Sequence, residues 1–230
     1  AARWDVEVAR EIWPDAPARV ASRVRHGGFL HDAELIENDF FHISPAETAA
    51  MDPQQRQLLE RSYAALHDAG MGKAALLGSV VAVNVGQWKS EFGGLLMSTP
   101  AGRSVYASTG FACSVTRGRI SFALGLQGAC STFDTACSSS LVANHTSMRG
   151  LQHMECPTAV STGVNMIFEP YTMLANAIGG FTSIAGRSHT FDQRADGYAR
   201  GEAINAITSG LYVEAGNSGV IGSAVRQDGR

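Results

Sequence analysis

The stretch TFDTACSSSLVANH, from Thr132 to His145, sets a single cysteine, Cys137, between an apolar approach and a run of three serines. The residues before Cys137 favour a strand and those after it a helix, so the thiol is expected at a strand-to-helix turn. The first N–H groups of a helix lack intrahelical partners and carry partial positive charge, which favours a thiolate and can hold an oxyanion. Cys137 is therefore a candidate nucleophile, although its spacing alone leaves a buried structural cysteine equally open.

Composition places the chain among ordinary globular proteins. With 230 residues, 45% of them hydrophobic, it is long enough to bury a core. A formal charge of −3 gives no reason to expect a nucleic-acid partner. No apolar run approaches the roughly 20 residues that span a bilayer, and the first residues do not form a signal peptide. The chain does not start with Met, so we expect it to begin inside a longer polypeptide.

The four cysteines are not spaced as metal ligands. They contain no C-x-x-C pair, so the sequence predicts no zinc site. A chain with few cysteines and no secretory signal is expected to keep its thiols reduced, in the cytoplasm. Cys113, Cys130 and Cys156 are expected to be small buried hydrophobic residues.

Two helix starts stand out before the cysteine region. Ser44 can cap a helix whose first residue is Pro45, with Glu47 completing a capping box. A second start follows at Asp52-Pro53, and Gly70 ends the run. Along this second helix the residues at helical spacing, which are expected to face the core, are Leu58, Leu59, Ser62, Ala65, Leu66 and Ala69.

Other segments alternate between strand and helix patterns, which predicts an α/β layered fold. The first forty residues and 88–102 are expected to be loops, and 113–125 and 138–154 helices. The predicted strands are 79–86, 129–136, 157–167, 203–215 and 219–225.

The segment DTACSSSL resembles the active-site motif of β-ketoacyl synthases, the ketosynthase domains of modular polyketide synthases and related fatty-acid synthases. Seven further segments resemble the same family and occur in the family's order across nearly the whole chain. They are RWD (3–5), GGFL (27–30), FFHISPAETAAMDPQQRQLLE (40–60), YASTG (106–110), GRISFALGLQG (118–128), FDQRADGYARGE (191–202) and SAVRQDGR (223–230).

This resemblance implies a thiolase-like αβαβα fold and a condensing acyltransferase. In the family, the cysteine that matches Cys137 takes an acyl group from a carrier-protein thioester, and its own amide forms part of the oxyanion hole. A malonyl-type extender is then decarboxylated and attacks the acyl group in a Claisen condensation. The partners implied are an acyl carrier protein bearing 4'-phosphopantetheine and a second copy of the chain, paired through the strand Ala129–Asp134. The domain itself is expected to bind no cofactor, no metal and no nucleic acid, and to have no membrane span.

The family also uses two histidines in downstream motifs resembling EAHGTGT and KxNIGH, and an opening strand resembling IAIVGM. None of these segments occurs here, so residues 1–230 are expected to be a partial ketosynthase domain, its N-terminal half without the first strand and without the second half. Such a piece alone is expected not to complete a condensation. His145 and His153 lie eight and 16 residues after Cys137 on the predicted helix and are expected to point away along its axis. None of the others (His26, His31, His42, His67 and His189) offers a better substitute.

Two alternatives from other functional classes stay open. One is a non-catalytic ketosynthase-like module that only dimerises or docks a carrier protein. The other is a cysteine hydrolase, which would need a histidine base near Cys137.

Overall fold

The computed structural model describes residues 11–211 and 219–226, and the chain divides into two compact units. One unit comprises residues 1–32 and 165–203, and the other comprises residues 33–164 and 204–230. The segment RWD and the end of the predicted strand 203–215 lie outside the described residues.

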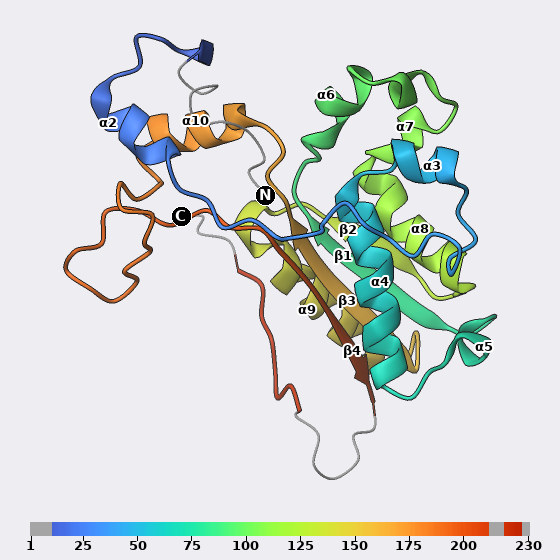
Figure 1. Ribbon diagram of the computed structural model, residues 1–230. Helices are drawn as coiled ribbons and strands as arrows, with labels where there is room; N and C mark the ends of the chain where they lie inside the picture. The colour runs from blue at the N-terminus through green and yellow to red at the C-terminus, as the bar shows by residue number, and fades with distance from the viewer. Residues whose placement is uncertain (1–10, 212–218, 227–230) are drawn as a thin grey trace. The chain divides into compact units, whose positions relative to one another are not determined.

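A four-stranded sheet with the order β2-β1-β3-β4 forms the centre of the larger unit (Figure 1). Strand β1 runs parallel to β2 on one side and to β3 on the other. Each strand overlaps a segment whose sequence predicts a strand, and only β1 extends past its predicted end, by the single residue Gln87. The strands are β1 (Val81–Gln87), β2 (Cys130–Phe133), β3 (Thr158–Asn165) and β4 (Ala203–Gly210).

Helices cover both faces of this sheet, which confirms the predicted α/β layering (Figure 1). Helix α9 (Ser139–Gln152) packs on one face of β1 and β2. Helices α4 (Pro53–Asp68) and α8 (Cys113–Leu124) pack together on the other face. The short helix α5 (Lys73–Leu76) precedes β1. Within the described ranges, we find no helix with the length and apolar character that a membrane crossing requires.

The predicted helix caps are confirmed. Helix α3 (Pro45–Ala50) begins after Ser44, whose Oγ accepts a hydrogen bond from the Glu47 N–H at 3.2 Å. Asp52 caps α4 by accepting from the Gln54 N–H at 2.7 Å. Gly70, just past α4, has a φ of +84°, a conformation that glycine adopts without steric cost. Of the residues expected to face the core, Leu58, Leu59, Ser62 and Leu66 are fully buried. Ala65 is half-buried, and Ala69 is exposed at the C-cap.

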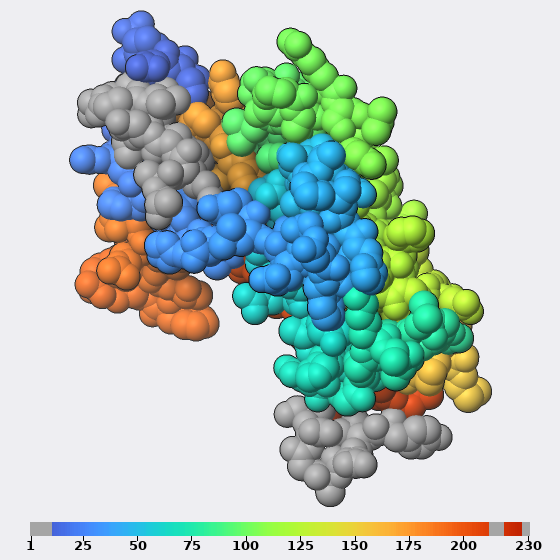
Figure 2. Space-filling view, turned by 45° about the vertical axis from the view of Figure 1, so that its right-hand side comes forward, coloured from blue at the N-terminus to red at the C-terminus, as the bar shows by residue number. Residues whose placement is uncertain are grey.

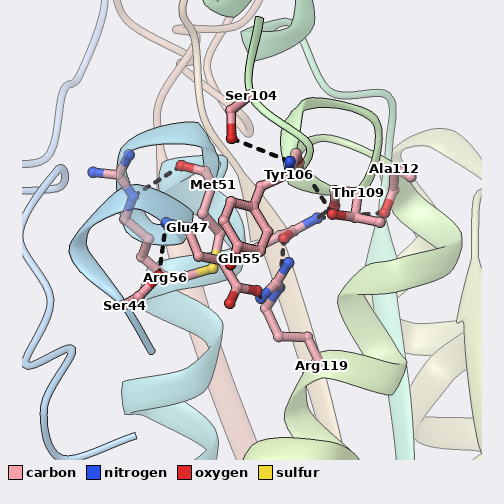
Figure 3. A network of polar contacts seen from close by, with 10 residues as sticks. All are labelled: Ser44, Glu47, Met51, Gln55, Arg56, Ser104, Tyr106, Thr109, Ala112 and Arg119. Atoms are coloured by element: carbon pink, nitrogen blue, oxygen red, sulfur yellow. Dashed lines mark hydrogen bonds and ion pairs between the residues drawn. The ribbon is translucent and has the colours of Figure 1, made fainter. Parts of the chain in front are cut away.

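A buried polar network joins α3, α4 and α8 (Figure 3). The Arg119 Nε–H of α8 donates to the Gln55 Oε1 at 2.9 Å, and the same guanidinium forms an ion pair with Glu47. The Gln55 amide in turn donates to the carbonyls of Thr109 and Ala112 at 3.3 and 3.4 Å. Because burial without partners is costly for such groups, this network specifies how the three helices meet.

The prediction of a loop at 88–102 is wrong. This region contains helix α6 (Phe92–Met97) and the 3₁₀ helix η2 (Pro100–Arg103), and helix α7 (Ala107–Gly110) follows. Its glycines and proline lower local helix propensity, but Leu96 and Ala107 pack with Ala50 of α3 in a buried cluster. The surface of this region adjoins that of α3 (Figure 2). Tertiary packing therefore overrides the local signal.

The strand predicted at 219–225 is also wrong, because residues 219–226 form no strand with any part of the described chain. The apolar residues that suggested a strand, Val220, Ile221 and Val225, are exposed. A β-strand forms only where it can hydrogen-bond to a neighbouring strand, and the composition of a segment does not supply that neighbour.

The smaller unit has its own core. Val20 and Val24 pack with Leu174 and Ala177, and these residues come from α2 (Ala18–Ala21), η1 (Ser22–Val24) and α10 (Pro170–Ile178). The expected loop character of the first forty residues is thus interrupted by helical segments, among them α2 and η1. The Glu202 carboxylate accepts from the backbone N–H groups of Leu30 at 2.8 Å and Ile167 at 2.9 Å. This carboxylate joins three segments that are distant in sequence.

Candidate active site

Cys137 lies where strand β2 gives way to helix α9, as the sequence predicts. Strand β2 ends at Phe133, the 3₁₀ helix η3 (Ala136–Ser138) follows, and α9 begins at Ser139. Cys137 is exposed, and its thiol is free. The structure thus presents the thiol in the 3₁₀ turn that leads directly into the 14-residue helix α9, open to reagents from solvent.

Side chains of the turn hold it in place through local hydrogen bonds. The Asp134 Oδ1 accepts from the Ala136 N–H at 3.1 Å. The Ser139 Oγ accepts from the Thr135 N–H at 2.8 Å and donates to the Ala136 carbonyl at 2.7 Å. The Ser138 hydroxyl donates to the Thr135 carbonyl at 2.8 Å. Two of the three serines therefore fix the turn itself.

The backbone of this turn is strained. Ala136 has a φ of +54°, in the left-handed region that residues with a Cβ seldom adopt. On either side of Cys137, the Ala136 and Ser138 N–H groups are hydrogen-bonded within the turn. The Cys137 N–H makes no hydrogen bond to the described residues, and it remains available to a bound group.

Two glycines bring the start of α9 close to the sheet. Gly86 of β1 and Gly163 of β3 lie opposite each other in the parallel ladder. A Cβ on Gly86 would come within 2.4 Å of the Ser140 nitrogen and 2.5 Å of the Ser139 carbonyl carbon. A Cβ on Gly163 would lie 2.6 Å from the Ser140 Cβ. No local sequence pattern marks these two glycines as a pair, because the register between β1 and β3 brings them together.

The other three cysteines are less accessible than Cys137, although full burial was predicted for all three and holds only for Cys156. Burial raises the pKa of the Cys156 thiol. Burial, assisted by the negative charges of Asp52 and Asp134, raises the pKa of the half-buried Cys113, whose thiol donates to the Trp88 carbonyl at 3.5 Å. Cys130 is half-buried on β2.

The histidines do not form a catalytic pair with Cys137 in the described part of the chain. His145 contacts the Ser223 hydroxyl at 2.7 Å through Nδ1, and His153 contacts Arg149 at 3.1 Å. His189 is half-buried, with a φ of +46°. Clusters of three or more potential metal ligands are likewise absent from the described residues. The arrangement supports nucleophilic chemistry at one thiol, without the histidine base that the hydrolase alternative requires.

This fold and this cysteine turn define the class of protein. The family described as "Beta-ketoacyl synthase, N-terminal domain" matches residues 1–208, and the chain belongs to this family. The resemblance inferred from the DTACSSSL segment is confirmed by this match.

The most informative relatives are modular polyketide synthases. The chain is 41% identical over 234 residues to a phenolphthiocerol/phthiocerol polyketide synthase polypeptide of Mycobacterium tuberculosis, covering 99% of this chain and 15% of that protein. It is 40% identical over 232 residues to a pikromycin polyketide synthase component of Streptomyces venezuelae, covering 98% of this chain and 6% of that protein. The chain therefore corresponds to a small part of these long proteins.

Solved structures of ketosynthases share the fold. A ketosynthase from module 6 of the bacillaene synthase of Bacillus subtilis matches with a TM-score of 0.78 and 30% identity, over 90% of this chain and 33% of that chain. A ketosynthase domain for oxazolomycin from Streptomyces albus matches with a TM-score of 0.76 and 32% identity, over 90% of this chain and 36% of that one. The predicted thiolase-like fold class is thereby confirmed.

Proposed function

We propose that Cys137 is the acyl-accepting nucleophile of a β-ketoacyl synthase that extends acyl chains by decarboxylative Claisen condensation. The observation that carries the proposal is the exposed thiol at the start of α9 in a turn that its neighbours fix. Membership of the β-ketoacyl synthase family supports the same chemistry.

In the acylation step, the Cys137 thiolate attacks the carbonyl carbon of an acyl thioester. The new C–S bond forms as the carbonyl π electrons move to oxygen, and the tetrahedral intermediate collapses by expelling the carrier's thiolate. The Cys137 N–H, which has no partner among the described residues, is the donor that we assign to the oxyanion. A preorganised donor of this kind typically contributes about 10²–10³ in rate.

In the condensation step, a malonyl-type extender loses carbon dioxide as its C–C bond breaks. The resulting enolate carbon attacks the acyl carbonyl on Cys137, a new C–C bond forms, and the Cys137 thiolate leaves. The product is a β-ketoacyl thioester on the carrier. This chemistry needs no resident cofactor, and the thiol that carries the extender belongs to the 4'-phosphopantetheine arm of an acyl carrier protein or domain.

We also propose that residues 1–230 belong to one ketosynthase domain and that this domain is a homodimer. Strand β2 is an edge strand of the described sheet, paired with β1 on one side only. Residues 129–133 carry no charged side chain. An unpaired, uncharged strand edge of this kind can hydrogen-bond to the same strand of a second copy. The segment Ala129–Asp134 is the interface that we infer. Four free thiols also support a cytoplasmic location, where thiols stay reduced.

The experiment that tests this function follows acyl-enzyme and product together. The protein that contains this chain is incubated with an acyl thioester and a malonyl-loaded carrier protein, and both species are measured by mass spectrometry. We expect a β-ketoacyl product whose formation falls on the order of 10³-fold or more in Cys137→Ala. The matched control Cys130→Ala should retain the activity. Product formation that survives in Cys137→Ala would refute the assignment, and a folded protein that docks the carrier without acyl-enzyme or product would favour the non-catalytic alternative.

A further inference from the structure

Four polar side chains meet between α9 and the sheet, on the face that also carries Gly86 and Gly163. The Asn84 amide of β1 donates to the Ser147 Oγ of α9 at 2.8 Å. The Asn144 amide of α9 donates to the Ser161 Oγ of β3 at 3.2 Å. Asn84 and Ser161 lie opposite each other in the ladder, whereas Asn144 and Ser147 are three residues apart on one helix face. We refer to these four residues as the Asn–Ser quartet.

The interface beneath α9 has three tiers, each set by a pair of residues in register on β1 and β3. The glycine pair lies under the first turn of the helix. The Asn–Ser quartet lies in the middle, with Asn84, Ser147 and Ser161 at 5%, 1% and 3% exposure. At the far end, Ala82 and Ala159 pack with Leu151 in an apolar cluster. The quartet is therefore a buried polar layer within an interface of small residues.

Such a layer has a different physical effect from the apolar tiers. Apolar contacts are non-directional, so a helix that rests on glycine and alanine can rotate or slide at low cost. A buried amide that loses its partner costs about 1–3 kcal/mol, so the two hydrogen bonds define one register of α9 over the sheet. The two hydrogen bonds hold α9 at Asn144 and Ser147, which follow Cys137 by seven and ten residues. At the rise of a helix these positions lie about 10 and 15 Å along the axis from Cys137. A shift at the quartet is transmitted by the rigid helix to the turn that holds the thiol.

We propose that the Asn–Ser quartet is a positioning element for Cys137, setting the depth and rotation of α9 and hence the alignment of the thiol with its oxyanion donor. The inference rests on the proposed role of Cys137 as the acyl acceptor. It assigns Asn84, Asn144, Ser147 and Ser161 no contact with the substrate. Their effect on the reaction passes through α9.

The test separates positioning from stability by measuring two reactions of the same thiol. Acyl transfer from an acyl thioester requires the thiol and the oxyanion donor to be aligned, whereas alkylation by iodoacetamide requires only an accessible thiolate. In the double variant N84L/S147A, which removes one hydrogen bond without leaving a buried orphan, we expect the single-turnover acylation rate of Cys137 to fall about 10–100-fold. The alkylation rate of Cys137 should stay within about twofold, since access to the thiol is unchanged. The same result is expected for N144L/S161A, which removes the other bond and serves if the first variant does not fold.

Two further variants complete the test. N84S/S147N exchanges the partners and restores an Asn–Ser hydrogen bond, so it should recover much of the acylation rate. Gln57→Met removes the hydrogen bond from Gln57 to the Leu35 carbonyl, at 2.9 Å on α4, and should lower thermal stability without changing the ratio of the two rates.

The outcomes distinguish this inference from the proposed function. Wild-type protein that is not acylated at Cys137 would refute the proposed function itself. Wild-type acylation that persists unchanged in folded N84L/S147A or N144L/S161A would overturn the positioning role alone. A parallel loss of acylation and alkylation would also overturn it, because it would show a loss of access to the thiol.

Discussion

Gly86 and Gly163 lie opposite each other on two parallel strands, and both lie beneath the first turn of α9, the helix that directly follows the candidate nucleophile. A side chain at either position would meet atoms of Ser139 or Ser140 at 2.4–2.6 Å. The close approach of α9 to the sheet is therefore possible only because neither position carries a Cβ atom. This relationship connects the packing of the sheet with the placement of the cysteine turn.

Substitution at this glycine pair should impair both stability and acylation. Gly86→Ala forces the start of α9 away from β1, because the contacts are with backbone that cannot rotate aside. We expect the free energy of unfolding to fall by about 1–3 kcal/mol and the acylation of Cys137 to fall with it. The control is Gly118→Ala on α8, because a Cβ at this position meets nothing within 4 Å. This substitution should raise the free energy of unfolding by about 0.5–1 kcal/mol, since alanine favours helix more than glycine does. Denaturant unfolding of both variants measures the difference, and equal stabilities would contradict this role of Gly86.

The four thiols should differ in reactivity. Cys137 is exposed, whereas burial raises the pKa of Cys113 and Cys156 and so lowers their thiolate fraction at neutral pH. Limiting iodoacetamide at pH 7 followed by peptide mapping should label Cys137 first. Labelling of Cys113 should increase when the pH is raised, because its thiolate then becomes populated. Equal labelling of all four thiols at pH 7 would argue against an accessible turn.

Asp52 should give the stability a pH dependence in the acid range. Burial raises the pKa of this carboxyl above its ordinary value of 3.8, against the opposing effect of hydrogen bonds from Ser90 and Gln54. The folded state then holds the proton more tightly than the unfolded state. Protonation of Asp52 therefore stabilises the folded state. This contribution to the free energy of unfolding is fully present below the ordinary pKa of 3.8 and is lost as the pH rises through the raised pKa of the folded state.

Two substitutions isolate this effect. Asp52→Asn keeps a residue that caps helices well but cannot titrate, so the contribution of this site to the pH dependence should vanish. Asp52→Ala also removes the cap and should cost about 1 kcal/mol at pH 7. Urea unfolding from pH 4 to pH 7 provides the measurement. A wild-type profile that matches Asp52→Asn across this range would show that the buried carboxyl does not titrate there.

The edge of β2 should carry the dimer contact. A lysine on an edge strand disfavours pairing with another strand, so Ser131→Lys on β2 is expected to weaken self-association. Ser209→Lys on β4, the opposite edge of the described sheet, is the matched control and should leave association unchanged. Sedimentation velocity at micromolar concentration should show a wild-type dimer and a Ser131→Lys monomer. A monomeric wild type would contradict the proposed dimer. A dimer in both variants would show that the interface does not include β2.

Features of the fold that depend on neighbouring residues in the sequence were predicted correctly. Ser44 with Pro45 and Asp52 with Pro53 start helices because each pair meets the needs of a helix N-terminus within a few residues. Gly125 ends α8 with a φ of +69°, again a local requirement. The placement of Cys137 at a strand-to-helix turn likewise followed from the residues on either side of it.

Features that depend on distant partners were not predicted. Helix α6 forms although it contains Gly93 and Gly94, because its Leu96 packs against Ala50. The segment 219–225 has the composition of a strand but no pairing among the described residues. The positioning of α9 depends on the register between β1 and β3, which brings Gly86 beside Gly163 and Asn84 beside Ser161. No local pattern encodes this register.

The central claim is that Cys137 forms a covalent acyl thioester, and one measurement tests it most directly. The intact protein is mixed with an excess of an acyl thioester, quenched in acid within a single turnover, digested, and mapped by mass spectrometry. We expect the added acyl mass on the peptide that contains Cys137, its removal by hydroxylamine, and its absence from Cys137→Ser under the same conditions. Acylation of Cys113 or Cys130 in its place, or a folded wild-type protein with no acyl mass on Cys137, would contradict the central claim.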